Sequence, residues 1–139
     1  MAGMPLKQMI MEKDEQNIGQ AAAHLKAVLE KPEMTNALDI GFLFVHMDLF
    51  AFRDALKAIA KAYEQKTGNL FQTELIVNAD DADFAKDDTA RKSRLRQMKA
   101  LREDSRVNKI ITRFVAKGKP GLVDLEPNVF ASDVRFEPI

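Results

Sequence analysis

Residues 36–68 read NALDIGFLFVHMDLFAFRDALKAIAKAYEQKTG, and they carry the strongest structural pattern in the chain. Large apolar residues recur here at alternating steps of four and three positions, which places them on one stripe of a helix. The stripe consists of Leu38, Phe42, Val45, Leu49, Phe52, Leu56, Ile59 and Tyr63. The sequence therefore predicts one helix over residues 37–67.

Both ends of this predicted helix have residues that are suited to stop it. Asn36 can accept hydrogen bonds from the first turn, and Asp39 resembles the acidic partner of a capping box. Gly68 can adopt the left-handed backbone conformation that ends many helices. An alternative interpretation makes residues 40–46 a strand that leads into a shorter helix.

The first half of the predicted helix is apolar on nearly every side, which means that more than one neighbour must cover it. The ordinary interpretation is the core of a single chain. Such a long helix nevertheless needs more cover than one preceding helix provides. We therefore predict a homo-oligomer that associates through this helix. The predicted interface consists of Phe42, Phe44, Phe50 and Phe52.

Weaker patterns predict the elements on either side. A helix is expected over residues 15–31, and residues 70–79, LFQTELIVNA, are expected to form a strand. Asp80 and Asp81 can cap a surface helix that extends to about Arg102. Its apolar edge is narrow and consists of Leu95, Met98 and Leu101.

The C-terminal part of the chain is ambiguous. Its β-branched residues favour a strand over residues 107–116, while a helix over residues 105–117 remains open. KGKPG, at residues 117–121, resembles the turn of a hairpin. Two more strands are expected at residues 122–125 and 129–136.

Length and composition suit one domain over residues 1–139. Apolar residues make up 46% of the chain, and nine Phe and seven Met suffice to fill one core. The fold class that we predict is α+β. In detail, a helical hairpin and a third helix pack on a small, mostly antiparallel sheet.

Composition also bears on where the protein acts. Cysteine is absent, which excludes disulfides, a thiolate zinc site and a cysteine nucleophile. The N-terminus lacks the pattern of a secretion signal, and the most apolar run, residues 40–52, is shorter than the roughly 20 residues that cross a bilayer. We expect a cytoplasmic protein with no membrane partner.

Charge is distributed unevenly along the chain. The 21 basic and 21 acidic residues balance, yet the basic block, residues 91–119, contains eleven Lys or Arg and two acids. Cations that no acid neutralises can replace the counterions of a phosphate backbone, so the block predicts binding to nucleic acid. The predicted binding residues are Arg91, Lys92, Arg94, Arg96, Lys99, Arg102, Arg106, Lys109, Arg113 and Lys117.

Two other interpretations of the block remain open. Its cations can pair with the acids of the chain itself, notably those at residues 80–88. Alternatively the protein is a structural or adaptor component of a larger bacterial or viral assembly, and the block contacts an acidic protein. Phe114 is the only aromatic residue within the block, so the block offers few rings for base stacking. Binding is therefore expected to be independent of the nucleotide sequence.

An enzyme is the third hypothesis. The run NADDADFAKDD, residues 78–88, follows a predicted strand, where the Asp80–Asp88 cluster can hold a cation for phosphate chemistry. The run lacks the central Gly and the closing Glu of a calcium loop, and helix capping explains its acids equally well. We predict a non-enzymatic binding protein with no catalytic residue, no metal site and no cofactor.

Overall fold

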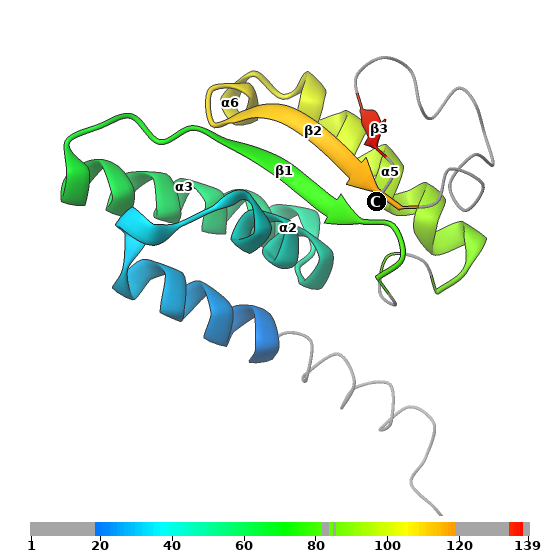
Figure 1. The fold of residues 1–139 in the computed structure, drawn as a ribbon, viewed down its shortest axis with the longest axis horizontal. Helices are drawn as coiled ribbons and strands as arrows, with labels where there is room; N and C mark the ends of the chain where they lie inside the picture. Colours follow the sequence, from blue (N-terminus) through cyan, green and yellow to red (C-terminus); the bar gives the residue numbers. More distant parts are fainter. Residues whose placement is uncertain (1–18, 82–83, 85, 119–133, 138–139) are drawn as a thin grey trace, which may run out of the picture.

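The computed structural model describes residues 19–81, 84, 86–118 and 134–137 of the chain. Within these residues three strands form one sheet in the order β1-β2-β3 (Figure 1). The strands are β1 (Thr73–Asn78), β2 (Ile111–Lys117) and β3 (Arg135–Glu137). Leu75 and Phe114 join the hydrophobic core on one face of the sheet, and Glu74 and Arg113, next to them in sequence, form an ion pair on the other face.

The prediction of a mostly antiparallel sheet is wrong, because both strand pairings are parallel. After β1 the chain passes through α5 (Asp88–Glu103) and α6 (Ser105–Asn108) before it enters β2. A helical connection returns the chain to the end of the sheet where the first strand began, so the two strands run in the same direction.

The predicted hairpin turn at residues 117–121 would place the next expected strand, residues 122–125, beside β2. In the described part of the chain β2 pairs with β1 on one side and β3 on the other. The strand expected at residues 122–125 lies outside the described residues, as do residues 119–121 of the turn and residues 129–133. Residues 135 and 136 of the last expected strand lie in β3, which extends one residue further, to Glu137.

The helix predicted over residues 37–67 is broken into α2 (Ala37–His46) and α3 (Leu49–Thr67). Met47 and Asp48 between them are extended, and the Asp48 carboxylate accepts a hydrogen bond from the Ala51 N–H at 2.8 Å. An aspartate that caps a new helix competes with continuation of the preceding one.

None of the helices in the described part of the chain combines the length and the apolar character needed to cross a membrane.

The outer ends of this helical pair are as predicted. The Asn36 side chain accepts from the N–H groups of Leu38 and Asp39, and the Asp39 carboxylate accepts from the Asn36 N–H, so the capping box is confirmed. Gly68 ends α3 with φ of 74° and donates its N–H to the Glu64 carbonyl. The alternative of a strand at residues 40–46 is excluded.

The first helical segment is confirmed for the residues that the structure describes. Residues 19–30 are helical, in agreement with the helix expected over residues 15–31, and a short 3-10 turn, η1 (Pro32–Met34), follows. His24 on this segment lies 3.0 Å from the Asp39 carboxylate, measured from Nε2 to Oδ1. This contact joins the segment to the start of α2.

The structure shows where α5 begins and which of the two alternatives forms at residues 105–117. α5 begins at Asp88 because Asp87, whose carboxylate accepts from the Ala90 N–H at 2.7 Å, caps it in place of Asp80 or Asp81. The segment for which strand and helix were both open divides: α6 occupies its start and the preferred strand, β2, begins at Ile111.

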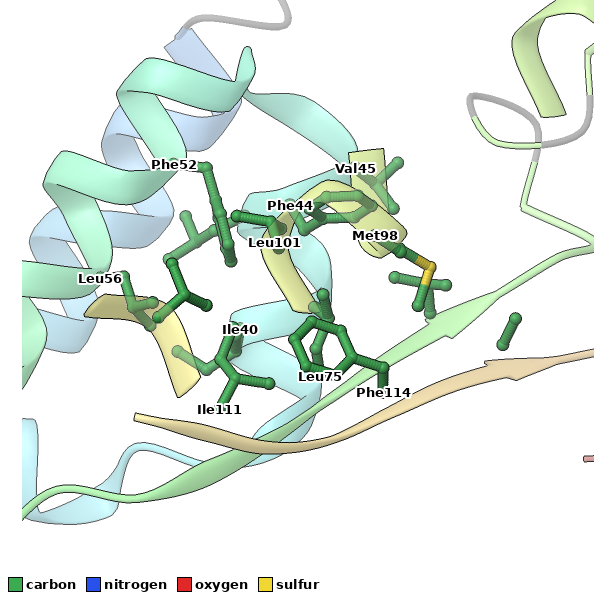
Figure 2. Close-up of a cluster of buried hydrophobic side chains, with 14 of the residues drawn as sticks. Ile40, Phe44, Val45, Phe52, Leu56, Leu75, Met98, Leu101, Ile111 and Phe114 are labelled. Atoms are coloured by element: carbon green, nitrogen blue, oxygen red, sulfur yellow. The ribbon is translucent and has the colours of Figure 1, made fainter. Parts of the chain in front are cut away.

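One hydrophobic core holds these elements together. Figure 2 shows side chains from α2, α3, α5 and the two longer strands pointing toward one another. The apolar edge predicted for α5 is confirmed, since all three of its residues are buried. Burying one large apolar side chain contributes about 1.5–3 kcal/mol, so α5 is held to the sheet mainly by this edge. Further core residues are Ile40, Phe44, Phe52, Leu56, Leu75, Ile111 and Phe114.

Helix α2 lies very close to the backbone of β1, and Gly41 makes this approach feasible. A Cβ atom built on Gly41 would lie 1.9 Å from the Ile76 carbonyl oxygen. Only glycine, which has no side chain, fits at such a distance. Gly41 therefore fixes how the apolar first half of the helical pair packs on the sheet.

Candidate polyanion-binding surface

The structure divides the ten predicted binding residues into two groups. Six cations interact with other groups of the protein itself, and four have no such partner in the described part of the chain. The first group is Arg91, Lys92, Arg94, Arg96, Arg106 and Arg113. The second group is Lys99, Arg102, Lys109 and Lys117.

Arg94 of α5 interacts with the end of α2. Its guanidinium donates to the carbonyl oxygens of Phe44 at 3.1 Å, Val45 at 2.6 Å and Met47 at 3.3 Å. It also donates to Gln97 Oε1 at 3.0 Å. The last carbonyls of a helix have no partner within it, and a cation there also matches the helix dipole. Arg94 therefore serves the fold.

Arg113 is occupied on the charged face of the sheet. It lies on the middle strand and forms ion pairs with Glu74 of β1, at 3.1 Å, and with Glu137 of β3. One guanidinium thus connects all three strands. Arg91 is similarly paired with Asp88, one turn before it on α5.

The second group differs in its surroundings. Arg102, Lys109 and Lys117 are exposed and Lys99 is half-buried. Lys99 and Arg102 lie in the last turns of α5, and Lys109 follows α6 directly. Lys117 stands apart, at the end of β2. The cations that are open to an outside anion are therefore concentrated within residues 99–109.

Asp104, Arg106 and Val107, which fall within residues 99–109, line a pocket of about 190 Å³ between α3 and α6, which we call the α3–α6 pocket. Arg53, Lys57 and Arg106 contribute three cations to its lining, against two carboxylates. The sequence did not connect α3 with the basic block, although Arg53 and Lys57 are one turn apart on the polar face of that helix. The other lining residues are Phe50, Asp54, Leu56, Asp104, Val107 and Ile110.

Asp104 organises the cations of this pocket. Its carboxylate accepts from Arg106 Nε at 3.2 Å and Nη2 at 3.1 Å, and from the Arg106 N–H at 2.9 Å. Arg53 Nε also lies 3.5 Å from Asp104 Oδ2. The side-chain and backbone hydrogen bonds from Arg106 lower the pKa of Asp104 from 3.8 to about 2. Asp104 thus remains ionised and holds two guanidinium groups together.

Acid should weaken the fold through this carboxylate. Because the pKa of Asp104 is about 2 when folded and 3.8 ordinarily, the unfolded chain takes up the proton first as pH falls. Its contribution is complete above the unfolded value and is lost between about pH 4 and about pH 2. In Asp104→Asn, which keeps a helix cap without the charge, the urea midpoint should depend less on pH in this window than in the wild type.

Asp54→Asn is the matched control, since Asp54 is an exposed carboxylate of the same pocket. Its urea midpoint should follow the wild-type pH dependence. Equal pH dependence in the wild type and Asp104→Asn would contradict the role assigned to Asp104.

The four phenylalanines of the predicted interface occupy three different environments. Phe44 and Phe52 are each 1% exposed and their rings meet edge to face in the core. Phe42 lies between the rings of His24 and His46, with centroids 4.4 Å and 4.3 Å away. Phe50 is 74% exposed. Self-association stays a prediction, and among these four only Phe50 offers an open ring to a partner.

The acidic run has mainly local roles. Asp87 caps α5, Asp88 pairs with Arg91, and Asp80 follows β1 in a turn in which its N–H donates to the Asn78 side chain. Asp83 lies outside the described residues. Within the residues that are described, no three His, Cys, Asp or Glu side chains gather as metal ligands.

The comparisons add no relative to this geometry. No protein-family model, curated protein or solved structure matches the chain.

Proposed function

We propose that this protein binds nucleic acid without catalysis, through a basic surface formed by Lys57, Lys99, Arg102, Arg106 and Lys109. The observation that carries the proposal is the division of the basic block. Arg94 and Arg113 serve the fold, whereas Lys99, Arg102 and Lys109 have no acidic partner in the described part of the chain. Asp104, Arg106 and Val107, which are close to these cations in sequence, line a pocket that also holds Arg53 and Lys57. Unneutralised cations at this density suit a phosphate backbone.

Salt dependence is the direct test of this proposal. If about four phosphates are neutralised, affinity for a single strand should fall about 50-fold between about 50 mM and about 200 mM salt, because the slope is about 0.7 per contact. Fluorescence anisotropy with labelled single and double strands of DNA and RNA measures it. If none of these nucleic acids binds at low salt, the proposal is wrong.

A charge-matched pair of variants locates the surface. Combining Lys99→Gln, Arg102→Gln and Lys109→Gln should reduce the single-strand salt slope by about two and weaken binding at low salt. The control combines Lys26→Gln, Lys31→Gln and Lys66→Gln, which removes three exposed positive charges elsewhere. Equal losses in both variants would show that net charge alone, and no particular surface, attracts the ligand.

Contact with another protein, including a second copy of this chain, is the second candidate. It is favoured by large apolar side chains that are exposed in the described part of the chain: Met34, Leu38, Phe50 and Leu70 are each at least 68% exposed. Light scattering over a wide concentration range tests association between copies. A single mass equal to that of one chain at every concentration would contradict the homo-oligomer.

A further inference from the structure

We infer that the α3–α6 pocket receives one unpaired nucleobase, stacked on the ring of Phe50, so that the ligand is a single strand. This inference rests on the proposed function and specifies its ligand class. The one aromatic residue of the basic block, Phe114, is buried. The fold supplies a ring from α3, because Phe50 lines the same pocket as Arg106.

The Phe50 ring is open to solvent. It stands in the first turn of α3, next to the cap that Asp48 forms with the Ala51 N–H. The Arg53 guanidinium carbon lies 5.8 Å from the ring centroid and covers one side. With 74% of the residue exposed, the ring keeps a surface on which a base can stack.

The pocket has the size and the chemistry for part of a nucleotide. At about 190 Å³ it is smaller than the roughly 300–1,000 Å³ pockets that enclose whole small ligands, which suits one planar ring. Leu56, Val107 and Ile110 provide apolar walls. Lys57 and Arg106 are exposed beside them and can contact the flanking phosphates.

The two carboxylates of the pocket are consistent with an anionic ligand. Asp104 lies between Arg53 and Arg106, so its charge is offset within the protein. Asp54 is exposed, and the lining contains three cations against these two carboxylates. The lining as a whole remains positive.

Stacking in this pocket distinguishes single strands from duplexes. In a duplex the bases cover one another and present only their edges, whereas an unpaired base can place its face on a side-chain ring. Phosphate contacts alone would act on both forms. A contribution from Phe50 should therefore be confined to single strands.

Tryptophan fluorescence provides a direct measurement, because the chain contains no Trp. Phe50→Trp introduces one at this position, and a single-stranded homopolymer of thymidine should quench its emission in a saturable way. Leu70→Trp places the probe at another exposed apolar site, 68% exposed, beyond the end of α3. Its emission should not change on addition of the same strand.

Affinity provides the second measurement. Phe50→Ala should weaken binding to the single strand about tenfold and leave the salt slope unchanged, because no charge is removed. Phe50→Trp should bind at least as tightly as the wild type. A blunt-ended duplex of equal length, which has no unpaired base, should bind the wild type and Phe50→Ala equally. Since Phe50 is exposed, circular dichroism should show both variants folded.

The outcomes separate this inference from the proposed function. If the wild type binds no nucleic acid, both are overturned. If it binds but Phe50→Ala loses no affinity and Phe50→Trp is not quenched, only the nucleobase pocket is overturned. If Phe50→Ala instead changes the mass of the protein in solution, Phe50 belongs to an interface between copies, and the nucleobase assignment is also overturned.

Discussion

Gly41→Ala should destabilise the protein by more than about 2 kcal/mol, although alanine favours a helix by about 1 kcal/mol over glycine. The reason is steric. The new Cβ would lie 1.9 Å from the Ile76 carbonyl oxygen, and an atom of the strand backbone cannot rotate away as a side chain can. Either α2 separates from β1 or the strand is displaced from its neighbour, and both changes open the core.

Urea unfolding followed by circular dichroism measures this loss. Gly19→Ala is the matched control, since Gly19 is also helical and a Cβ there meets no atom within 4 Å. This variant should be neutral or more stable by up to about 1 kcal/mol. If Gly41→Ala proved as stable as Gly19→Ala, α2 would not lie against β1 in the way described.

Features fixed by neighbouring residues could be predicted from the sequence. The capping box of α2 depends on Asn36 and Asp39, which are three positions apart, and the end of α3 depends on Gly68 alone. The apolar edge of α5 follows from helical spacing. Each is a local pattern with one low-energy solution, so no knowledge of the rest of the fold was needed.

The direction of the strands and the break near Asp48 were predicted wrongly for different reasons. The order strand, helix, strand favours a parallel crossover, whereas the turn-like KGKPG favours an antiparallel hairpin. The apolar stripe continues through Met47 and Asp48 without a change of period, so periodicity could not reveal that Asp48 caps a second helix.

The basic surface could be predicted only in part, because charge counting ignores distant partners. Arg113 pairs with Glu74, which is 39 positions away, and Arg94 reaches the Val45 carbonyl over 49 positions. Phe50 and Lys57 likewise join the pocket only through packing of α3 against α6. A basic run in a sequence is thus an upper limit on the cations that are open to a ligand.

Arg94→Met should lower stability by about 3 kcal/mol, while Arg102→Met should change it by less than about 0.5 kcal/mol. Both residues are on α5, and the substitution keeps a long apolar side chain. In Arg94→Met, however, the carbonyls of Phe44 and Val45 lose a charged donor at the part-buried end of α2. Arg102 is exposed and has no partner among the described residues.

Arg94→Lys tests whether geometry or charge matters at this position. One guanidinium donates to three carbonyls through its Nη1 and Nη2 atoms, whereas a single ammonium group cannot reproduce that planar fork. We expect Arg94→Lys to recover less than half of the stability lost in Arg94→Met. Thermal unfolding suffices to rank these variants, at roughly 4 °C for each kcal/mol in a chain of this size.

These variants also determine how binding data on the basic block must be interpreted. Loss of nucleic-acid binding in an Arg94 variant would follow from an altered end of α2, whereas loss in Arg102→Met, which stays folded, would report a phosphate contact. If Arg94→Met instead kept its full stability and lost binding to the same extent as Arg102→Met, its guanidinium would face an outside anion. The capping role of Arg94 would then be wrong, and the basic surface would extend toward the start of α5.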